Sequence, residues 1–300
     1  MNQMIATSPA DARTIPWWRW IPLGLIHLGC LGVFWVGVSP AALTVCFLAY
    51  VLRVFALTAG YHRLFAHNAY KTSRPFQFLL ALGGVSSMQL GPLWWASIHR
   101  HHHICADQEG DVHSPARQGF FWAHLGWIAS GRYSRTEMER VKDFAAYPEL
   151  VFLDRHARLI GLLMGALLLV LGEGLRLAKP SWNTSGPQLL VWGFFISTVL
   201  VYHVTFSINS LAHMVGRRRF DTRDTSRNNT WLALLAMGEG FHNNHHRYAA
   251  SVRQGFYWWE IDLSYLILRL LAAVGIVWDL RLPPAAVLAE GRAHSKGGTQ

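Results

Sequence analysis

The sequence has few cysteines and few charged residues. Its 300 residues include 3 Cys, and Asp, Glu, Lys and Arg together make up 15%. Cys30, Cys46 and Cys105 are an odd number and lack the close spacing of metal-binding cysteines. They therefore indicate neither a disulfide framework nor a cysteine-based metal site. We expect all three to be reduced residues that pack in the interior.

Apolar residues are abundant instead. They make up 52% of the chain, and the mean hydropathy is +0.19. These values are typical of a membrane protein. The formal net charge of +10 indicates an anionic membrane surface rather than nucleic acid, because Lys and Arg lie mostly outside the apolar runs.

Four apolar runs are predicted to cross a membrane, at residues 21–38, 41–60, 159–171 with flanks, and 188–207. Ser39-Pro40 separates the first two, so they form a hairpin. Of the 27 Lys and Arg residues, only Arg176 and Lys179 fall in the two loops on the outer side. The positive-inside rule therefore places both termini and the segments 61–158 and 208–284 in the cytoplasm. The tail, 285–300, is predicted to be disordered.

Two further apolar segments are predicted not to cross the membrane, and three polar residues lie within the predicted spans. Residues 76–88 are apolar but too short, and residues 261–277 are interrupted by charges, so both are expected to be helices lying on the membrane or on the protein. Arg53 lies late in the second run, where its side chain is expected to snorkel to the interface. His27 and His203 have no cluster partners and are interpreted as packing residues.

Three histidine clusters dominate the polar part of the chain. They are His62-x-x-x-x-His67, His99-x-x-His102-His103 and His242-x-x-His245-His246. Because a helix turns once per 3.6 residues, side chains three and four apart share a face, so each cluster can present several imidazoles in one direction. Imidazole is a ligand for Fe, Zn, Cu and Ni. Three spaced clusters favour a metal centre over a surface polyhistidine tract or a pH-sensing patch.

Polar residues just after the central cluster have two open interpretations. Asp107, Glu109, Asp111 and His113 follow the cluster, and the three carboxylates either orient ligand imidazoles by accepting their second N–H or are ordinary solvated loop charges. His101 occupies the variable position of its motif, and we leave it outside the ligand set.

These motifs resemble those of integral-membrane fatty acid desaturases of the stearoyl-CoA (delta-9) type. The resemblance covers roughly residues 45 to 260 and includes Gly60-Tyr61-His62-Arg63-Leu64, Asp111-Val112-His113-Ser114-Pro115, His124-Leu125-Gly126-Trp127 and Asn209-Ser210-Leu211-Ala212-His213. It implies an all-α membrane protein in which four transmembrane helices and a cytosolic helical cap form one domain, 1–300.

The resemblance also implies a di-iron centre. Its ligands would be nine histidines, namely His62, His67, His99, His102, His103, His213, His242, His245 and His246. Asn209 would contact the second metal through water. A saturated methylene offers side chains no acidic proton, so its oxidation calls for O2 chemistry at a metal. The implied reaction converts an acyl chain, O2, two electrons and two protons into a cis alkene, at delta-9, and two waters.

The substrate tunnel and the partners are further implications. Tyr50 lies twelve residues before His62, about 18 Å deeper along a helix, and either limits the length of the tunnel or is a core or lipid-facing aromatic. An acyl-CoA substrate is implied, with an acyl-lipid or acyl carrier protein substrate as the alternative, because Ser97-Ile98 stand where the animal acyl-CoA enzymes have an Arg-Asp pair. Electrons would come from a separate donor, such as ferredoxin or cytochrome b5 with its reductase.

Two other functions compete with this one. A membrane di-iron hydroxylase shares the histidine clusters, although the segments around His113 and His213 favour a desaturase. A metal transporter or storage protein is less consistent, because transporters place ionisable ligands within the spans. The expected location is a bacterial inner membrane, with membrane lipids as surroundings and no nucleic acid as partner.

Overall fold

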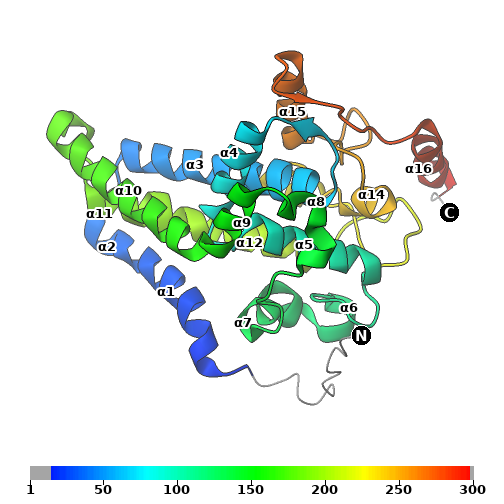
Figure 1. Ribbon diagram of the computed structural model, residues 1–300, viewed down its shortest axis with the longest axis horizontal. Helices are drawn as coiled ribbons and strands as arrows, with labels where there is room; N and C mark the ends of the chain where they lie inside the picture. The colour runs from blue at the N-terminus through cyan, green and yellow to red at the C-terminus, as the bar shows by residue number, and fades with distance from the viewer. Residues whose placement is uncertain (1–14, 298–300) are drawn as a thin grey trace.

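The computed structural model describes residues 15–297 and is mostly helical, with very little strand. This confirms the expected all-α class. Within the described residues four helices are long and apolar enough to cross a membrane, namely Trp17–Val36, Pro40–Ala66, Ala157–Ala178 and Gly186–His213. They form the elongated part of the molecule on the left of Figure 1, and the segments at 67–156 and 214–297, here called the cap, complete the fold.

Three of these long helices change their winding along their length. The first comprises η1 (Trp17–Trp20), α1 (Ile21–Gly29), η2 (Cys30–Gly32) and α2 (Val33–Val36); the second comprises α3 (Pro40–Phe55) and the π-helix η3 (Ala56–Ala66). The third is α10 (Ala157–Ala178), and the fourth comprises α11 (Gly186–Leu190), η7 (Val191–Ile196), α12 (Ser197–Asn209) and η8 (Leu211–His213). The first two meet at a reversal where Gly37 has φ 64° and the Ser39 side chain caps α3.

The helices are longer than the apolar runs suggest. The second continues beyond residue 60 to Ala66, because His62 and Arg63 are buried inside the protein and need no aqueous surface. The third continues to Ala178, so the loop expected at 172–187 is reduced to the short connection that contains η6 (Pro180–Trp182). His62 therefore lies within a buried part of the helix, and His67 follows directly at its end.

Arg53 does not snorkel, so that prediction is wrong. The side chain is buried, and its guanidinium donates to the hydroxyls of Ser86 at 3.3 Å, Ser197 at 2.6 Å and Thr198 at 3.1 Å. These hydroxyls come from α12 and from the end of α4 (Arg74–Val85). A charge within a membrane-spanning helix is tolerated where it faces the interior and finds polar partners. Arg53 thus joins α3 to two neighbouring helices.

The helix that carries the central histidines, α5 (Pro92–Cys105), is fixed at its beginning by a distant residue. Asp154 of α9 (Pro148–Arg155) accepts a hydrogen bond from the Trp94 N–H at 2.8 Å, where a helix needs a cap. Gly91 precedes the helix, and a Cβ there would lie 2.2 Å from the Asp154 carboxylate. The bare backbone at Gly91 therefore allows this cap and sets the position of α5.

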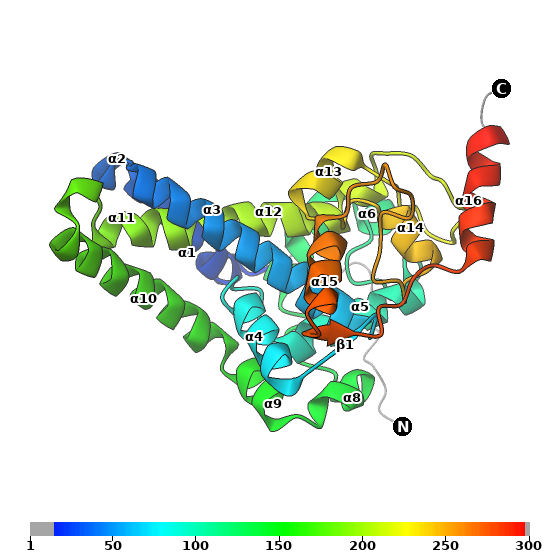
Figure 2. The same ribbon diagram turned by 90° about the horizontal axis from the view of Figure 1, so that it is seen from above.

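The remaining elements are short and belong to the cap. They are α6 (Pro115–Gln118), η4 (Trp122–Gly126), α7 (Trp127–Ser130), η5 (Met138–Val141), α8 (Lys142–Ala145), α13 (Thr230–Leu235), α14 (His242–Arg247), α15 (Leu263–Ala273) and α16 (Ala285–Gly297), with a two-stranded ribbon of β1 (Lys71–Thr72) and β2 (Val277–Trp278). Helix α15 has 11 residues and is too short to span, as the sequence indicates. Figure 2 shows it beside the ribbon.

The predicted disorder of the tail is wrong for the described part, because α16 packs on the cap near α14 (Figures 1 and 2). Val287 is buried against Phe220, Phe256 and Tyr257, and Glu290 forms an ion pair with Arg247 at 2.5 Å. These contacts stabilise a segment whose composition alone is typical of disorder. Both chain ends were predicted to lie in the cytoplasm. Residues 1–14 and 298–300, which form these ends, lie outside the described residues.

Candidate metal centre

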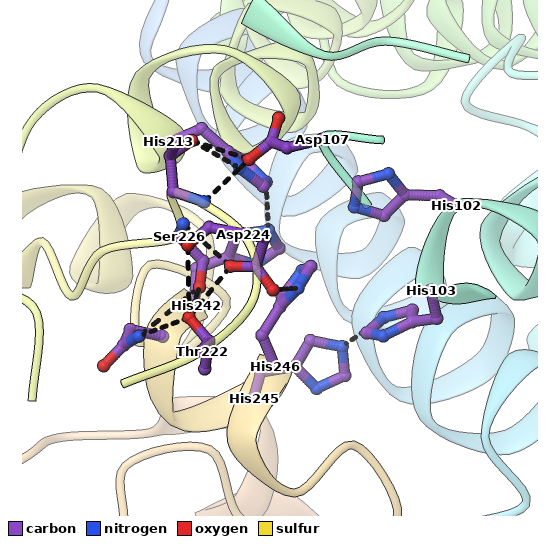
Figure 3. Close-up of polar contacts among 12 residues, drawn as sticks. His102, His103, Asp107, His213, Thr222, Asp224, Ser226, His242, His245 and His246 are labelled. Carbon is purple, nitrogen blue, oxygen red and sulfur yellow. Dashed lines mark hydrogen bonds and ion pairs between the residues drawn. The ribbon is translucent and has the colours of Figure 1, made fainter. Parts of the chain in front are cut away.

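The structure brings all nine predicted histidines together in two groups. The five-histidine group contains His62, His67, His99, His103 and His245, and the four-histidine group contains His102, His213, His242 and His246. Within each group the ring nitrogens lie within 4.8 Å of one another. They come from η3 and its end, α5, η8 and α14, and Figure 3 shows the side chains of α5 and α14 facing each other. Each group could hold a metal ion.

The nitrogen spacing fits metal binding. Neighbouring Nε2 atoms lie 3.0 Å apart for His62 and His245, 2.9 Å for His67 and His99, 2.9 Å for His103 and His245, and 3.1 Å for His213 and His242. Ligands at adjacent corners of an octahedron with metal–nitrogen bonds of about 2.1 Å lie about 3.0 Å apart. The buried Nε2 atoms of His102 and His246 have no hydrogen-bond partner, which leaves their lone pairs available. The donor set therefore fits two metal ions.

The protonation states also suit metal binding. Burial, reinforced by the neighbouring imidazoles, lowers the pKa well below the ordinary value for His67, His99, His103, His242 and His245. Burial lowers the pKa of His246 to about 4. A buried imidazole in such a cluster is neutral at physiological pH and offers a lone pair.

Carboxylates hold the outer nitrogens of three histidines of the four-histidine group. The Nδ1–H of His102 donates to Asp111 at 2.8 Å, and that of His246 donates to Asp224 at 2.9 Å. His213 donates to Asp107 at 3.2 Å, which is visible with Asp224 in Figure 3. Such bonds fix the tautomer, so that Nε2 is the nitrogen that faces inward.

The charge of these carboxylates is secured by their surroundings. Burial alone would raise the pKa of Asp107, Asp111 and Asp224, but hydrogen bonds from their partner histidines and from other donors lower it below the ordinary value. The carboxylates thus remain ionised behind the imidazoles, where they increase the basicity of the inward nitrogens.

The five-histidine group has a comparable support that sequence reasoning missed. Glu239 and Gln254 both contact Nδ1 of His62, and Glu239 also pairs with Arg63 at 3.2 Å. Arg63 in turn pairs with Asp262 at 3.0 Å, which ties η3 to the start of α15. Glu239 lies three residues before His242, a position that could have suggested it, whereas nothing in the sequence signalled Asp224.

The residues whose role the sequence left open fall into two classes. Asp107 and Asp111 orient imidazoles, while Glu109 is exposed and has no described contact with the histidines. His113 packs against Trp127, with ring centroids 5.2 Å apart, and orients none of the nine through a described hydrogen bond. His101 turns away to the Gly110 carbonyl at 3.0 Å, in agreement with its exclusion.

Three further histidines form a separate chain. His27 and His203 are joined by their Nε2 atoms at 3.1 Å, His203 Nδ1 lies 3.0 Å from His124 Nε2, and His124 Nδ1 lies 2.9 Å from the Ser210 hydroxyl. His27 Nδ1 also contacts the Leu23 carbonyl at 2.7 Å, an acceptor that fixes Nδ1 as a donor. His27 and His203 therefore pack helices together, as the sequence indicated, through a polar contact between α1 and α12.

Two cavities adjoin the histidines. The entrance cavity, of about 380 Å³, runs from the exposed residues Trp18, Ser134 and Arg158 to His99 and Asn209. The inner cavity, of about 40 Å³, is lined by apolar residues that include Val54 and Leu57, together with His62 and His242. The two share a wall that consists of Trp95, His99, Thr205 and Asn209. A long apolar ligand could therefore pass beside both histidine groups.

Tyr50 and Asn209 have different surroundings. Asn209 lines both cavities beside His99, so it faces the space next to the histidines. Tyr50 lines neither cavity, and its hydroxyl donates to the Leu235 carbonyl of α13 at 2.9 Å. Val54 and Leu57, further along the same helix, line the inner cavity.

Comparison with known proteins gives a consistent result. The family model described as fatty acid desaturase matches residues 38–278. The sn-1 stearoyl-lipid 9-desaturase of Anabaena variabilis is 36% identical over 267 residues, which are 87% of this chain and 91% of that protein. Delta-9 acyl-lipid desaturase 1 of Arabidopsis thaliana is 37% identical over 264 residues, or 86% and 81% of the two chains. The acyl-CoA C20 Delta5-desaturase of Anemone leveillei is 34% identical over 270 residues, or 87% and 80%.

Proposed function

Because the chain belongs to the fatty acid desaturase family, we propose that it inserts a cis double bond at delta-9 of a saturated acyl chain, using O2 and two electrons at a di-iron centre. The observation that supports this most directly is the convergence of nine histidines beside a two-part cavity. The relatives divide between lipid-bound and CoA-bound substrates, so the carrier of the acyl chain is a separate question.

The two groups support one division of the ligands between the two ions. One iron would be held by His62, His67, His99, His103 and His245, and the other by His102, His213, His242 and His246. Asn209 is part of the shared wall and would reach the second iron through water. The two irons, when bound, supply the reduction of O2 and the removal of two hydrogens from neighbouring carbons.

The protein itself positions the chain. An acyl chain that enters from the outer end of the entrance cavity would place its middle at the shared wall, between Trp95 and Thr205, and its methyl end beside Val54. A saturated chain offers no polar groups for recognition, so the walls must select the reacting carbons by shape. Val54 and Leu57, rather than Tyr50, would limit the chain length.

The partners and location are part of the same proposal. Electrons would come from a separate donor, either a ferredoxin or cytochrome b5 with its reductase. The concentration of Lys and Arg on the side of the histidine clusters supports a cytoplasmic active site in a multi-pass protein of a bacterial inner membrane.

The test is expression in a desaturase-deficient host, with double bonds in total fatty acids located by derivatisation and mass spectrometry. The wild type should give cis-delta-9 monoenes and His102→Ala should give none. His101→Ala is the matched control, because this imidazole lies one residue away and outside both groups, and it should retain the product. Hydroxylated chains would assign a hydroxylase instead, and an unchanged profile in a host with a competent donor would refute the proposal.

A further inference from the structure

The outer end of the entrance cavity carries two arginines and no carboxylate. Arg19 and Arg158 both line it, and no Asp or Glu is among its described lining residues. Neither arginine forms an ion pair with a carboxylate in the part of the chain that the structure describes. Most of the lining is apolar, so the cavity combines an apolar interior with a positive entrance.

Arg19 is held in place by the neighbouring backbone. Its guanidinium lies over the Trp18 ring at 4.9 Å and against Gly131, where an added Cβ would fall 1.3 Å from Nη1. Gly131 has φ +64°, a conformation that favours glycine, and it follows the last residue of α7. Any side chain at position 131 would displace Arg19 from the entrance.

Both arginines lie where membrane-spanning helices begin. Arg19 is the third residue of the first spanning helix, and Arg158 is the second residue of the third. Trp17 and Trp18 are 76% and 53% exposed beside Arg19, which is the arrangement of an aromatic belt at the boundary between lipid and water. The entrance of the cavity is therefore at the depth of the lipid head groups.

We propose that Arg19 and Arg158 bind the phosphate of a glycerophospholipid whose acyl chain enters the cavity, and so select a membrane phospholipid as the substrate. This rests on the proposed desaturase function and names its substrate class. A guanidinium matches the geometry of a phosphate. An uncharged sugar head group would offer the two unpaired guanidiniums no negative charge to bind. Because both arginines sit at the membrane boundary, they match a phosphate anchored in the bilayer better than one on a soluble nucleotide carrier.

The test measures binding without turnover. The full-length protein is placed in phospholipid-free vesicles of digalactosyldiacylglycerol that contain a small fraction of a probe with a diazirine on a stearoyl chain. The probe is phosphatidylglycerol, monogalactosyldiacylglycerol, stearoyl-CoA or stearoyl-acyl carrier protein, and labelled peptides from the cavity are quantified after irradiation. The phosphatidylglycerol probe should label the cavity most strongly in the wild type.

The variants identify the arginines. Arg19→Gln and Arg158→Gln should each reduce cavity labelling by phosphatidylglycerol about fivefold, the contribution of one basic residue near an anionic lipid. The double lysine variant, Arg19→Lys with Arg158→Lys, should retain part of the labelling, because the charge remains but the paired N–H donors of the guanidinium are lost. Arg155→Gln is the matched control, since this exposed arginine lies three residues from Arg158 and does not line the cavity.

Several results would overturn the proposal. They are labelling by the sugar lipid equal to that by phosphatidylglycerol, stronger labelling by stearoyl-CoA or by stearoyl-acyl carrier protein, or an equal loss in Arg155→Gln. Failure here is distinguishable from failure of the proposed function, because labelling requires neither iron nor an electron donor. A protein that desaturates fatty acids but ignores the phospholipid probe would retain the function and lose this substrate assignment.

Discussion

Replacing Asp111 with asparagine tests whether the carboxylates behind the histidines control metal binding. Asp111 accepts hydrogen bonds from His102 Nδ1 at 2.8 Å and from the Asp107 backbone N–H at 2.7 Å, and it is buried. Asparagine has the same shape but only one acceptor oxygen, so either the imidazole or the backbone N–H loses its partner. It also removes the negative charge that increases the basicity of His102.

The expected size of the effect follows from these two losses. Partners of metal-bound histidines typically change metal affinity or activity by roughly 10- to 100-fold, which corresponds to about 1.4 to 2.8 kcal/mol of binding free energy. An unsatisfied buried donor costs folding stability about 1 to 3 kcal/mol in addition. Asp111→Asn should therefore fold, bind iron more weakly and lose most of its activity.

The measurement is the iron content of the purified protein after equilibration with increasing concentrations of a chelator. Asp111→Asn should release iron at a chelator concentration at least ten times lower than the wild type does. Glu109→Gln removes an exposed charge from the same loop and should behave as the wild type. Wild-type retention of iron by Asp111→Asn, or an equal loss in Glu109→Gln, would refute the reasoning.

Four further predictions follow from the same contacts. In the unfolded protein histidines bind protons below about pH 6.5, whereas the pKa of His246 in the folded protein is about 4. The stability of the metal-free protein should therefore fall as the pH drops from 6.5 to 4 and be nearly constant above pH 7. Thermal unfolding measured from pH 8 to 5 would test this, and a flat profile would contradict it. Val54→Trp should fill the inner cavity and shift the products towards shorter acyl chains, as measured by gas chromatography. Tyr50→Phe should cost about 1 kcal/mol of stability through one lost hydrogen bond without changing chain length, and a shift in chain length would restore Tyr50 to the tunnel. Asp154→Ala should lower stability by about 1 kcal/mol through loss of the α5 cap, and an unchanged denaturation midpoint would show that Trp94 N–H finds another acceptor.

The convergence of the nine histidines could be predicted from their motifs, but their division into groups could not. His99 and His103 lie four residues apart on one face of α5 and belong to one group, whereas His102, between them in sequence, belongs to the other. Helical periodicity places all three on neighbouring sides of a helix but does not state which partner helix each side meets. That assignment depends on contacts such as the one between His103 and His245, 142 residues apart.

The same limit explains the incorrect predictions. The sequence around Arg53 contains no sign of its hydroxyl partner Ser197, which is 144 residues away. An aqueous interface was therefore predicted for this charge. The polar composition of the tail predicts disorder. The ion pair that holds the tail, between Glu290 and Arg247, joins residues 43 apart and is not visible in the local sequence. Local composition predicts which segments are apolar, whereas the partners of isolated charges are determined by how the helices pack.

The wall shared by the two cavities divides any bound acyl chain into one part of fixed length and one part of variable length. If Arg19 and Arg158 hold the head group, the number of carbons between the entrance and Trp95 is set by the protein. The number beyond the wall depends only on how much of the chain the inner cavity accepts. Such a protein sets the position of the double bond by its distance from the carboxyl end. Products from substrates of different total length then share one double-bond position and differ only in the length of the saturated methyl end.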